Sequence, residues 1–92
     1  MQNKNDKTAQ LRKAIGEIIS IERVENTIYK SCNSFENAYD FSSGSIYKIE
    51  NAKIDCKVIT LWKVAEALGL KPSELLKIIE DKLGDNFKLI DE

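Results

Sequence analysis

The chain has 92 residues, and its 14 Lys and Arg against 15 Asp and Glu give a net charge of −1 at neutral pH. This length suits a single domain, and one Pro with four Gly is too few for a turn-rich β-sandwich, which favours an all-α fold. Two cysteines at no metal-ligand spacing, in a chain without His, predict no metal site, and no cofactor is expected. Neither a signal peptide nor an apolar run of membrane length is evident, so we expect a cytoplasmic protein with reduced thiols and no membrane contact.

The N-terminal third is predicted to hold one long helix. Residues 1–7, MQNKNDK, are polar and charged, and we expect a disordered lead-in there. The helix is predicted to begin near Thr8 and to end around residues 24–26, because apolar residues recur on one helical face: Leu11, Ala14, Ile15, Ile18, Ile19 and Ile21. The next segment, 26–34, has no clean period and is predicted to be a connection. It offers three candidate caps for the following helix: Ser31, Asn33 and Ser34.

Two short helices are predicted next. The first spans residues 34–39, and Asp40 follows at a turn, where Asp tolerates left-handed geometry. Its inward residues are expected to be Phe35, Ala38 and Tyr39. The second begins with Ser42 as its N-cap and ends near Asn51.

Two further helices complete the predicted domain. One spans residues 58–68 and is ended by Gly69, and the other has Pro72 in its first turn and is broken at residues 84–86. The apolar stripe of the 58–68 helix is expected to be Val58, Leu61, Trp62, Ala65 and Leu68. The folded domain is therefore expected over residues 8–83. Residues 84–92 form a tail whose apolar side chains either pack back on the domain or contribute to a dimer interface.

The helix predicted around residues 42–51 has an outer face that is free of acids. At 100° per residue, Ile46 and Ile49 define its buried side. The opposite side carries four residues: Gly44, Tyr47, Lys48 and Asn51. Such groups can donate hydrogen bonds to base edges and phosphates, but they are also typical of any solvated helix face. Gly44 either permits the backbone to approach DNA closely or stands where a base-contacting side chain would otherwise be. Glu50 projects towards the buried side, where Arg23 is its expected partner.

Two adjoining segments resemble a known family. Residues 46–53, IYKIENAK, match the I-x-x-I-E-N-G-K pattern that ends a recognition helix. Residues 60–70, TLWKVAEALGL, match the T-L-x-K-I-A-E-A-L-G-V helix that follows it. Both patterns are typical of lambda-repressor-like (Cro/C1-type, Xre-family) helix-turn-helix domains, and the resemblance extends more loosely over residues 11–76. It implies a compact five-helix domain whose second and third helices form the helix-turn-helix. The chain departs from the family pattern at four positions: Glu36 stands where a small Ala is expected, Asp40 and Ala52 each replace a Gly, and Cys56 stands where Pro is frequent.

The resemblance also implies a function. The family binds a double-stranded DNA operator sequence-specifically, usually as a homodimer, in transcriptional regulators of bacteria and phages that are commonly repressors. The residues that it places at the DNA are Asn33, Ser34, Ser43, Gly44, Tyr47, Lys48, Asn51 and Lys53. It also makes Arg23 and Glu50 the counterpart of the family's internal Arg–Glu pair.

A second class of function stays open at this point. The same fold could serve as a protein-interaction module, such as an antitoxin, an anti-repressor or an accessory subunit, which the acidic balance and the Gly in the reading face would suit. An enzyme is not expected, because the chain has no His, no Gly-rich phosphate loop and no nucleophile elbow. No motif indicates a small-molecule ligand.

Overall fold

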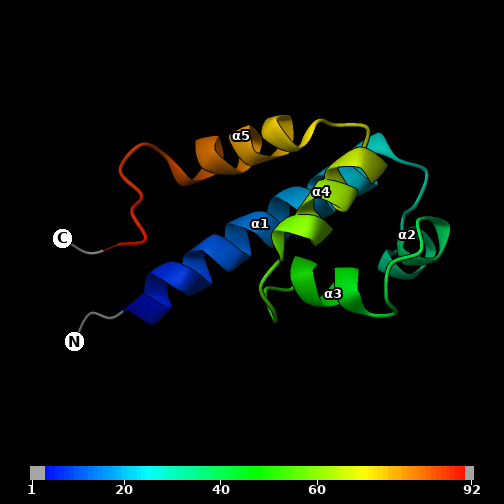
Figure 1. The fold of residues 1–92 in the computed structure, drawn as a ribbon, viewed down its shortest axis with the longest axis horizontal. Coiled ribbons are helices and arrows are strands. Elements are labelled where there is room, and N and C mark those ends of the chain that lie inside the picture. The colour runs from blue at the N-terminus through cyan, green and yellow to red at the C-terminus, as the bar shows by residue number, and fades with distance from the viewer. Residues whose placement is uncertain (1–3, 91–92) are drawn as a thin grey trace.

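The longest helix, α1, forms the axis around which the other four helices are arranged (Figure 1). The structure, a computed structural model, describes residues 4–90, and within this range it contains no strand. Five helices follow one another along the chain: α1 (Lys4–Asn26), α2 (Cys32–Ala38), α3 (Ser45–Glu50), α4 (Val58–Ala67) and α5 (Pro72–Leu83). α3 and α5 both contact α1, α2 contacts α3, and α4 contacts α5. The expected all-α fold with five helices is confirmed for the described residues.

The starts of the first two helices differ from the expectation. α1 begins at Lys4, so residues 4–7 are helical and do not form a disordered lead-in, while residues 1–3 lie outside the described part of the chain. α2 begins at Cys32, two residues early, because Ser31 is its N-cap. The Ser31 Oγ accepts a hydrogen bond from the Ser34 N–H at 3.1 Å, which satisfies a free donor of the first turn.

The third helix is shorter than predicted, and the prediction that Ser42 caps it is wrong. α3 starts at Ser45 and is preceded by Gly44 in a left-handed conformation, with φ of +82°. The Ser42 carbonyl instead accepts hydrogen bonds from the Ser45 N–H at 3.0 Å and the Ser45 Oγ at 2.7 Å, which closes a turn ahead of the helix. Asp40 has φ of +61°, as expected for the turn after α2, and Ala52 has φ of +60° directly after α3.

The hydrophobic core lies between α1 and the shorter helices. Its buried residues are Ala14, Ile18, Ile19, Phe35, Ile46, Ile49, Leu61, Val64, Ala65, Leu68, Leu75 and Ile79. Phe35 organises an aromatic cluster at the α2 end, where it stacks on Phe41 with ring centroids 5.6 Å apart and meets Tyr39 edge-on at 5.4 Å. This cluster joins α2 to the turn that leads into α3.

α4 buries a different stripe from the predicted one. Val58 and Trp62 were expected inside, but their exposed fractions are 71% and 55%. Trp62 lies about 110° around the helix from the centre of the buried stripe, so its ring points away from the core. The expectation was also wrong for Ile21 and Ala38, which are exposed, and Tyr39 is only partly covered.

The C-terminal tail packs back on the domain only in part. The Phe87 side chain is half-buried, and the Phe87 N–H makes a long hydrogen bond of 3.4 Å to the Gly84 carbonyl. Leu89 and Ile90 are exposed. The tail therefore has one half-buried aromatic side chain, that of Phe87, and two exposed aliphatic side chains, those of Leu89 and Ile90.

α1 and α3 cross at Gly16 with almost no space between their backbones. A Cβ on Gly16 would lie 2.5 Å from the carbonyl oxygens of Ile49 and Glu50, and both neighbours are backbone atoms that cannot rotate away. Only glycine permits this separation, because any side chain would push the end of α3 off α1.

We expect Gly16→Ala to destabilise the fold by about 1–3 kcal/mol, since the overlap with two carbonyls outweighs the roughly 1 kcal/mol that Ala gains in helix propensity. Urea unfolding followed by circular dichroism measures the change. Lys13→Ala, an exposed change on the same helix, should stay within about 0.5 kcal/mol of the parent. A Gly16→Ala protein as stable as the parent would contradict the close crossing.

Candidate nucleic-acid interface

The outer face of α3 carries three side chains that project away from the core. Ile46 and Ile49 are buried on the opposite side, so Tyr47, Lys48 and Asn51 are left exposed. Tyr47 has about half of its surface exposed, at 52%. The structure thus places these three predicted residues together on one helix face.

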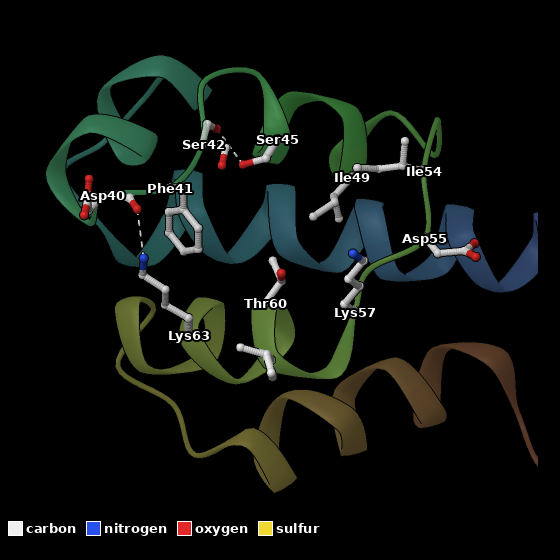
Figure 2. Close-up of a pocket in the computed structure, with 11 residues that line it drawn as sticks. Asp40, Phe41, Ser42, Ser45, Ile49, Ile54, Asp55, Lys57, Thr60 and Lys63 are labelled. Carbon is white, nitrogen blue, oxygen red and sulfur yellow. Dashed lines mark hydrogen bonds between the residues drawn. The ribbon is translucent and has the colours of Figure 1, made fainter.

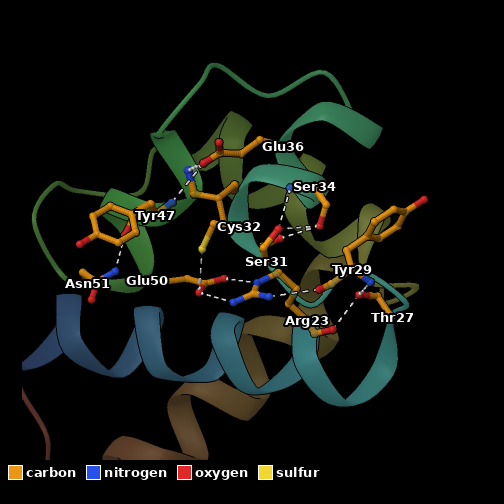
Figure 3. A network of polar contacts seen from close by, with 11 residues as sticks. Arg23, Thr27, Tyr29, Ser31, Cys32, Ser34, Glu36, Tyr47, Glu50 and Asn51 are labelled. Atoms are coloured by element: carbon orange, nitrogen blue, oxygen red, sulfur yellow. Dashed lines mark hydrogen bonds and ion pairs between the residues drawn. The ribbon is translucent and has the colours of Figure 1, made fainter.

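Most of the polar groups on this face have no partner in the domain. Among residues 7–90, no hydrogen bond or ion pair involves the Tyr47 hydroxyl or the ammonium groups of Lys48 and Lys53. Asn51 is partly engaged, because its Nδ2 donates to the Tyr47 carbonyl at 2.8 Å, which leaves its carbonyl oxygen open (Figure 3). Lys53 is held close to the helix end, where its N–H donates to the Lys48 carbonyl at 2.8 Å. The face therefore offers two cations, a phenol and an amide to a ligand.

Gly44 has a conformational reason to be glycine. Its φ of +82° lies in the region that disfavours side chains, although a Cβ built there would meet no atom within 4 Å. The space in front of Gly44 is thus open, and the neighbouring Ser43 is exposed with no hydrogen bond among the described residues. Gly44 is needed to turn the chain into α3, and its backbone is accessible from outside.

A buried carboxylate, Glu36 of α2, caps the start of α3. Its Oε1 accepts a hydrogen bond from the Gly44 N–H at 2.9 Å, and its Oε2 accepts from the N–H groups of Ile46 at 2.8 Å and Tyr47 at 3.2 Å. The Glu36 residue is only 3% exposed. One side chain thus satisfies three donors at the helix N-terminus, and its negative charge lies at the positive end of the helix dipole.

Sequence reasoning noticed Glu36 as a departure from the family pattern but missed this role. The available signal was the position of Glu36, which follows the core residue Phe35 and precedes Gly44 by eight residues. Between Glu36 and Gly44 the only other carboxylate is that of Asp40. A buried acid requires hydrogen-bond donors, and the unpaired N–H groups of a nearby helix start can supply them.

The other end of α3 is held by the expected ion pair. Arg23 of α1 binds Glu50 with two parallel hydrogen bonds, Nε to Oε2 at 2.8 Å and Nη2 to Oε1 at 2.9 Å (Figure 3). Both side chains are more than nine-tenths buried. Arg23 Nη1 also donates to the Tyr29 carbonyl at 3.1 Å, and the hydrogen bond to Glu50 raises the pKa of Arg23. The predicted Arg23–Glu50 pair is confirmed.

Cys32 completes this buried polar cluster. Its thiol lies 3.3 Å from Glu50 Oε1 and donates a hydrogen bond to it. Burial, followed by the contact with Glu50, raises the pKa of the Cys32 thiol to about 11, so it stays protonated at neutral pH. Burial alone raises the pKa of Cys56 to about 11. Neither thiol is a reactive thiolate under these conditions.

The two predicted DNA-contacting residues of α2 have their polar groups engaged within α2 and its cap. Asn33 is exposed, and its Oδ1 accepts a hydrogen bond from Asn37 Nδ2 at 2.9 Å. The Ser34 hydroxyl is occupied locally by the Ser31 Oγ at 2.9 Å and the Ser31 carbonyl at 3.0 Å. Both residues belong to the first turn of α2, and no hydrogen bond joins either of them to the outer residues of α3.

A hollow of about 350 Å³ adjoins α3 on the side that faces α4 (Figure 2). Ser45 and Ile49 of α3 line it from one side, and Thr60 and Lys63 line it from α4. Lys63 Nζ donates to the Asp40 carbonyl at 2.9 Å and lies 4.7 Å from the Phe41 ring centre, so it ties α4 to the turn before α3. A second tie joins Arg12 of α1 to Asp55 at 2.6 Å in the loop after α3.

The charged side chains exposed on the outer face of α3 and just after it are lysines, although the chain as a whole is not basic. Glu36 and Glu50 are the acids of the α2–α3 unit other than Asp40, and both face inward against hydrogen-bond donors. Lys48 and Lys53 are exposed. The surface that α3 presents therefore has a local cationic character that the net charge of −1 conceals.

We expect Glu36→Ala to destabilise the protein by about 2–4 kcal/mol, because three N–H groups at the start of α3 lose their acceptor. This holds even though Ala is the residue that the family resemblance would place there. Urea unfolding gives the value, and amide exchange should show faster opening at residues 44–47 than in α5. Glu80→Ala, which removes an exposed acid from α5, serves as the control and should be nearly neutral.

Among the described residues there is no group of three His, Cys, Asp or Glu side chains that could hold a metal, and no helix long and apolar enough to cross a membrane. Comparison of the chain with family models, with curated proteins and with solved structures gave no significant match.

Proposed function

We propose that this chain is a lambda-repressor-like helix-turn-helix domain that binds double-stranded DNA sequence-specifically as a transcriptional regulator, with α3 as its recognition helix. One observation carries the proposal. α3 has only six residues, too few to be stable alone, yet buried carboxylates fix both of its ends. On its outer side, the Tyr47 hydroxyl and the Lys48 ammonium have no partner among the described residues. Such an arrangement suits a helix whose purpose is to present its outer face at a defined position.

The proposed roles follow from position along α3. Tyr47 and Lys48 lie on the outer face and would read base edges, with Ser43 near its start. Gly44 would permit close approach of the DNA there, because no side chain stands in front of it. At the other end, two residues would bind phosphates: Asn51 and Lys53. Asn33 would reach a phosphate from the start of α2. The Ser34 hydroxyl would do so only after breaking its hydrogen bonds to Ser31. A repressor acting on a two-fold-symmetric operator is the form of regulator that we propose.

A protein-interaction module is the second candidate function. It is favoured by a separate observation, the exposed apolar surface of α4, where Ile59 has 83% of its surface uncovered. In that case the lysines around α3 would be solvated and the chain would bind DNA weakly or not at all.

Selection of bound fragments from random DNA by the purified protein, at physiological salt, separates the two candidates. Sequence-specific binding predicts that a shared motif is enriched over successive rounds. If a folded protein enriches no motif, the DNA-binding proposal is wrong and the interaction module is favoured.

Substitutions of two lysines should then affect binding differently. We expect Lys48→Ala to weaken binding to the selected site by about 1–3 kcal/mol and to relax preference at one position, because it removes a base contact. Lys53→Ala should weaken all sequences alike and reduce the slope of log affinity against log salt by about one. Fluorescence anisotropy over a salt series measures both. Lys77→Ala, an exposed lysine of α5 that pairs with Asp81, is the matched control and should bind as the parent does.

A further inference from the structure

An apolar patch on α4 remains uncovered by the rest of the domain. Val58, Ile59 and Trp62 lie at spacings that place them on one side of the helix, and they expose 71%, 83% and 55% of their surfaces. Ile54, from the loop before α4, is 40% exposed and lines the same hollow as Ile59. We call these four residues the α4 patch. A contiguous apolar surface of this kind, bordered by polar side chains, is typical of a protein–protein contact.

The hollow beside the patch extends this surface towards α3. Phe41 and Ile49 line it together with Ile54 and Ile59, and lysine and aspartate side chains stand at its edge (Figure 2). The patch and the hollow together therefore form an apolar surface with a concave part and a protruding part. Two such surfaces can interlock when one is turned to face the other.

The charges around the patch favour a second copy of the chain as the partner. Lys57 and Lys63 stand at its edge together with Asp55 and Glu66, so the border carries two cations and two anions. A strongly acidic or strongly basic partner would meet like charges along half of this border. A second copy presents the same mixture and can place opposite charges together about a two-fold axis.

The position of the patch is compatible with use of the outer face of α3. Tyr47, Lys48 and Asn51 neither belong to the patch nor line the hollow. Two copies joined through α4 would leave both of these faces uncovered.

We propose that the α4 patch is the contact surface of a two-fold-symmetric homodimer of this chain, with Ile59 and Trp62 at its centre. Tryptophan buried at the centre of an interface is a common energetic hot spot. A homodimer is already implied by the proposed function, which the inference deepens by placing the contact on α4. The contact itself needs no DNA, so its test can fail while DNA binding holds. Self-association is thus placed on α4 instead of on the tail of residues 84–92.

The test measures self-association of the whole chain without DNA. Sedimentation velocity over a dilution series gives the dissociation constant, and Trp62, the only tryptophan, reports burial through a blue shift of its emission as concentration rises. We expect Ile59→Glu to raise the dissociation constant at least roughly tenfold. Ile28→Glu is the matched control, because Ile28 is also isoleucine and is 81% exposed, in the link between α1 and α2 outside the patch. It should associate as the parent does.

Three outcomes would overturn the proposal. The parent chain could be monomeric up to the highest concentration, Ile59→Glu could associate as tightly as the parent, or Ile90→Glu in the tail could weaken association while Ile59→Glu does not. Circular dichroism checks that the variants fold. We expect them to fold, because Ile28, Ile59 and Ile90 are all exposed. Trp62→Gln is a second patch variant and should weaken association in the same way. Lys48→Ala should leave association unchanged whether or not it affects DNA binding.

Discussion

The position of α3 depends on two buried carboxylates that approach it from opposite ends. A six-residue helix has too few internal hydrogen bonds to hold its own shape, so its geometry is set by what it touches. Glu36 from α2 fixes the N-terminal amides, while Glu50 from α3 itself reaches Arg23 on α1. Gly16 lets the two backbones meet beside that pair. The orientation of every outer side chain on α3 follows from these contacts, and loss of any one of them would shift the whole face.

Sequence periodicity was sufficient for the five helices and for the Arg23–Glu50 pair, because each rests on short-range spacing or on a charge that needed a partner. It failed at the start of α3, where the sequence offers both a local cap candidate and a carboxylate eight residues before Gly44. Ser42 looked like the cap of α3, but the acceptor is Glu36, which belongs to another helix. The stripe of α4 failed for a different reason. That helix is apolar on both sides, so pattern alone could not tell the core side from the side with Val58 and Trp62.

The formal charge of the chain describes its surface poorly. Glu36 and Glu50 count against a nucleic-acid partner in any sum over the sequence, yet both are enclosed and their charges are balanced by helix amides and by Arg23. The candidate site was therefore predictable as a set of residues on one helix face. Its electrostatics were predictable only in part, because the inward position of Glu50 was expected and that of Glu36 was not.

The Glu36 cap also changes what α3 can offer to an anion. The amide groups at the start of a helix can attract a phosphate, but at the start of α3 an internal carboxylate already occupies that position and offsets the partial positive charge. The domain thus carries its own substitute for a backbone phosphate at this point. Any nucleic acid that approaches α3 has to be attracted by mobile lysine side chains instead of by the fixed peptide dipoles of the helix.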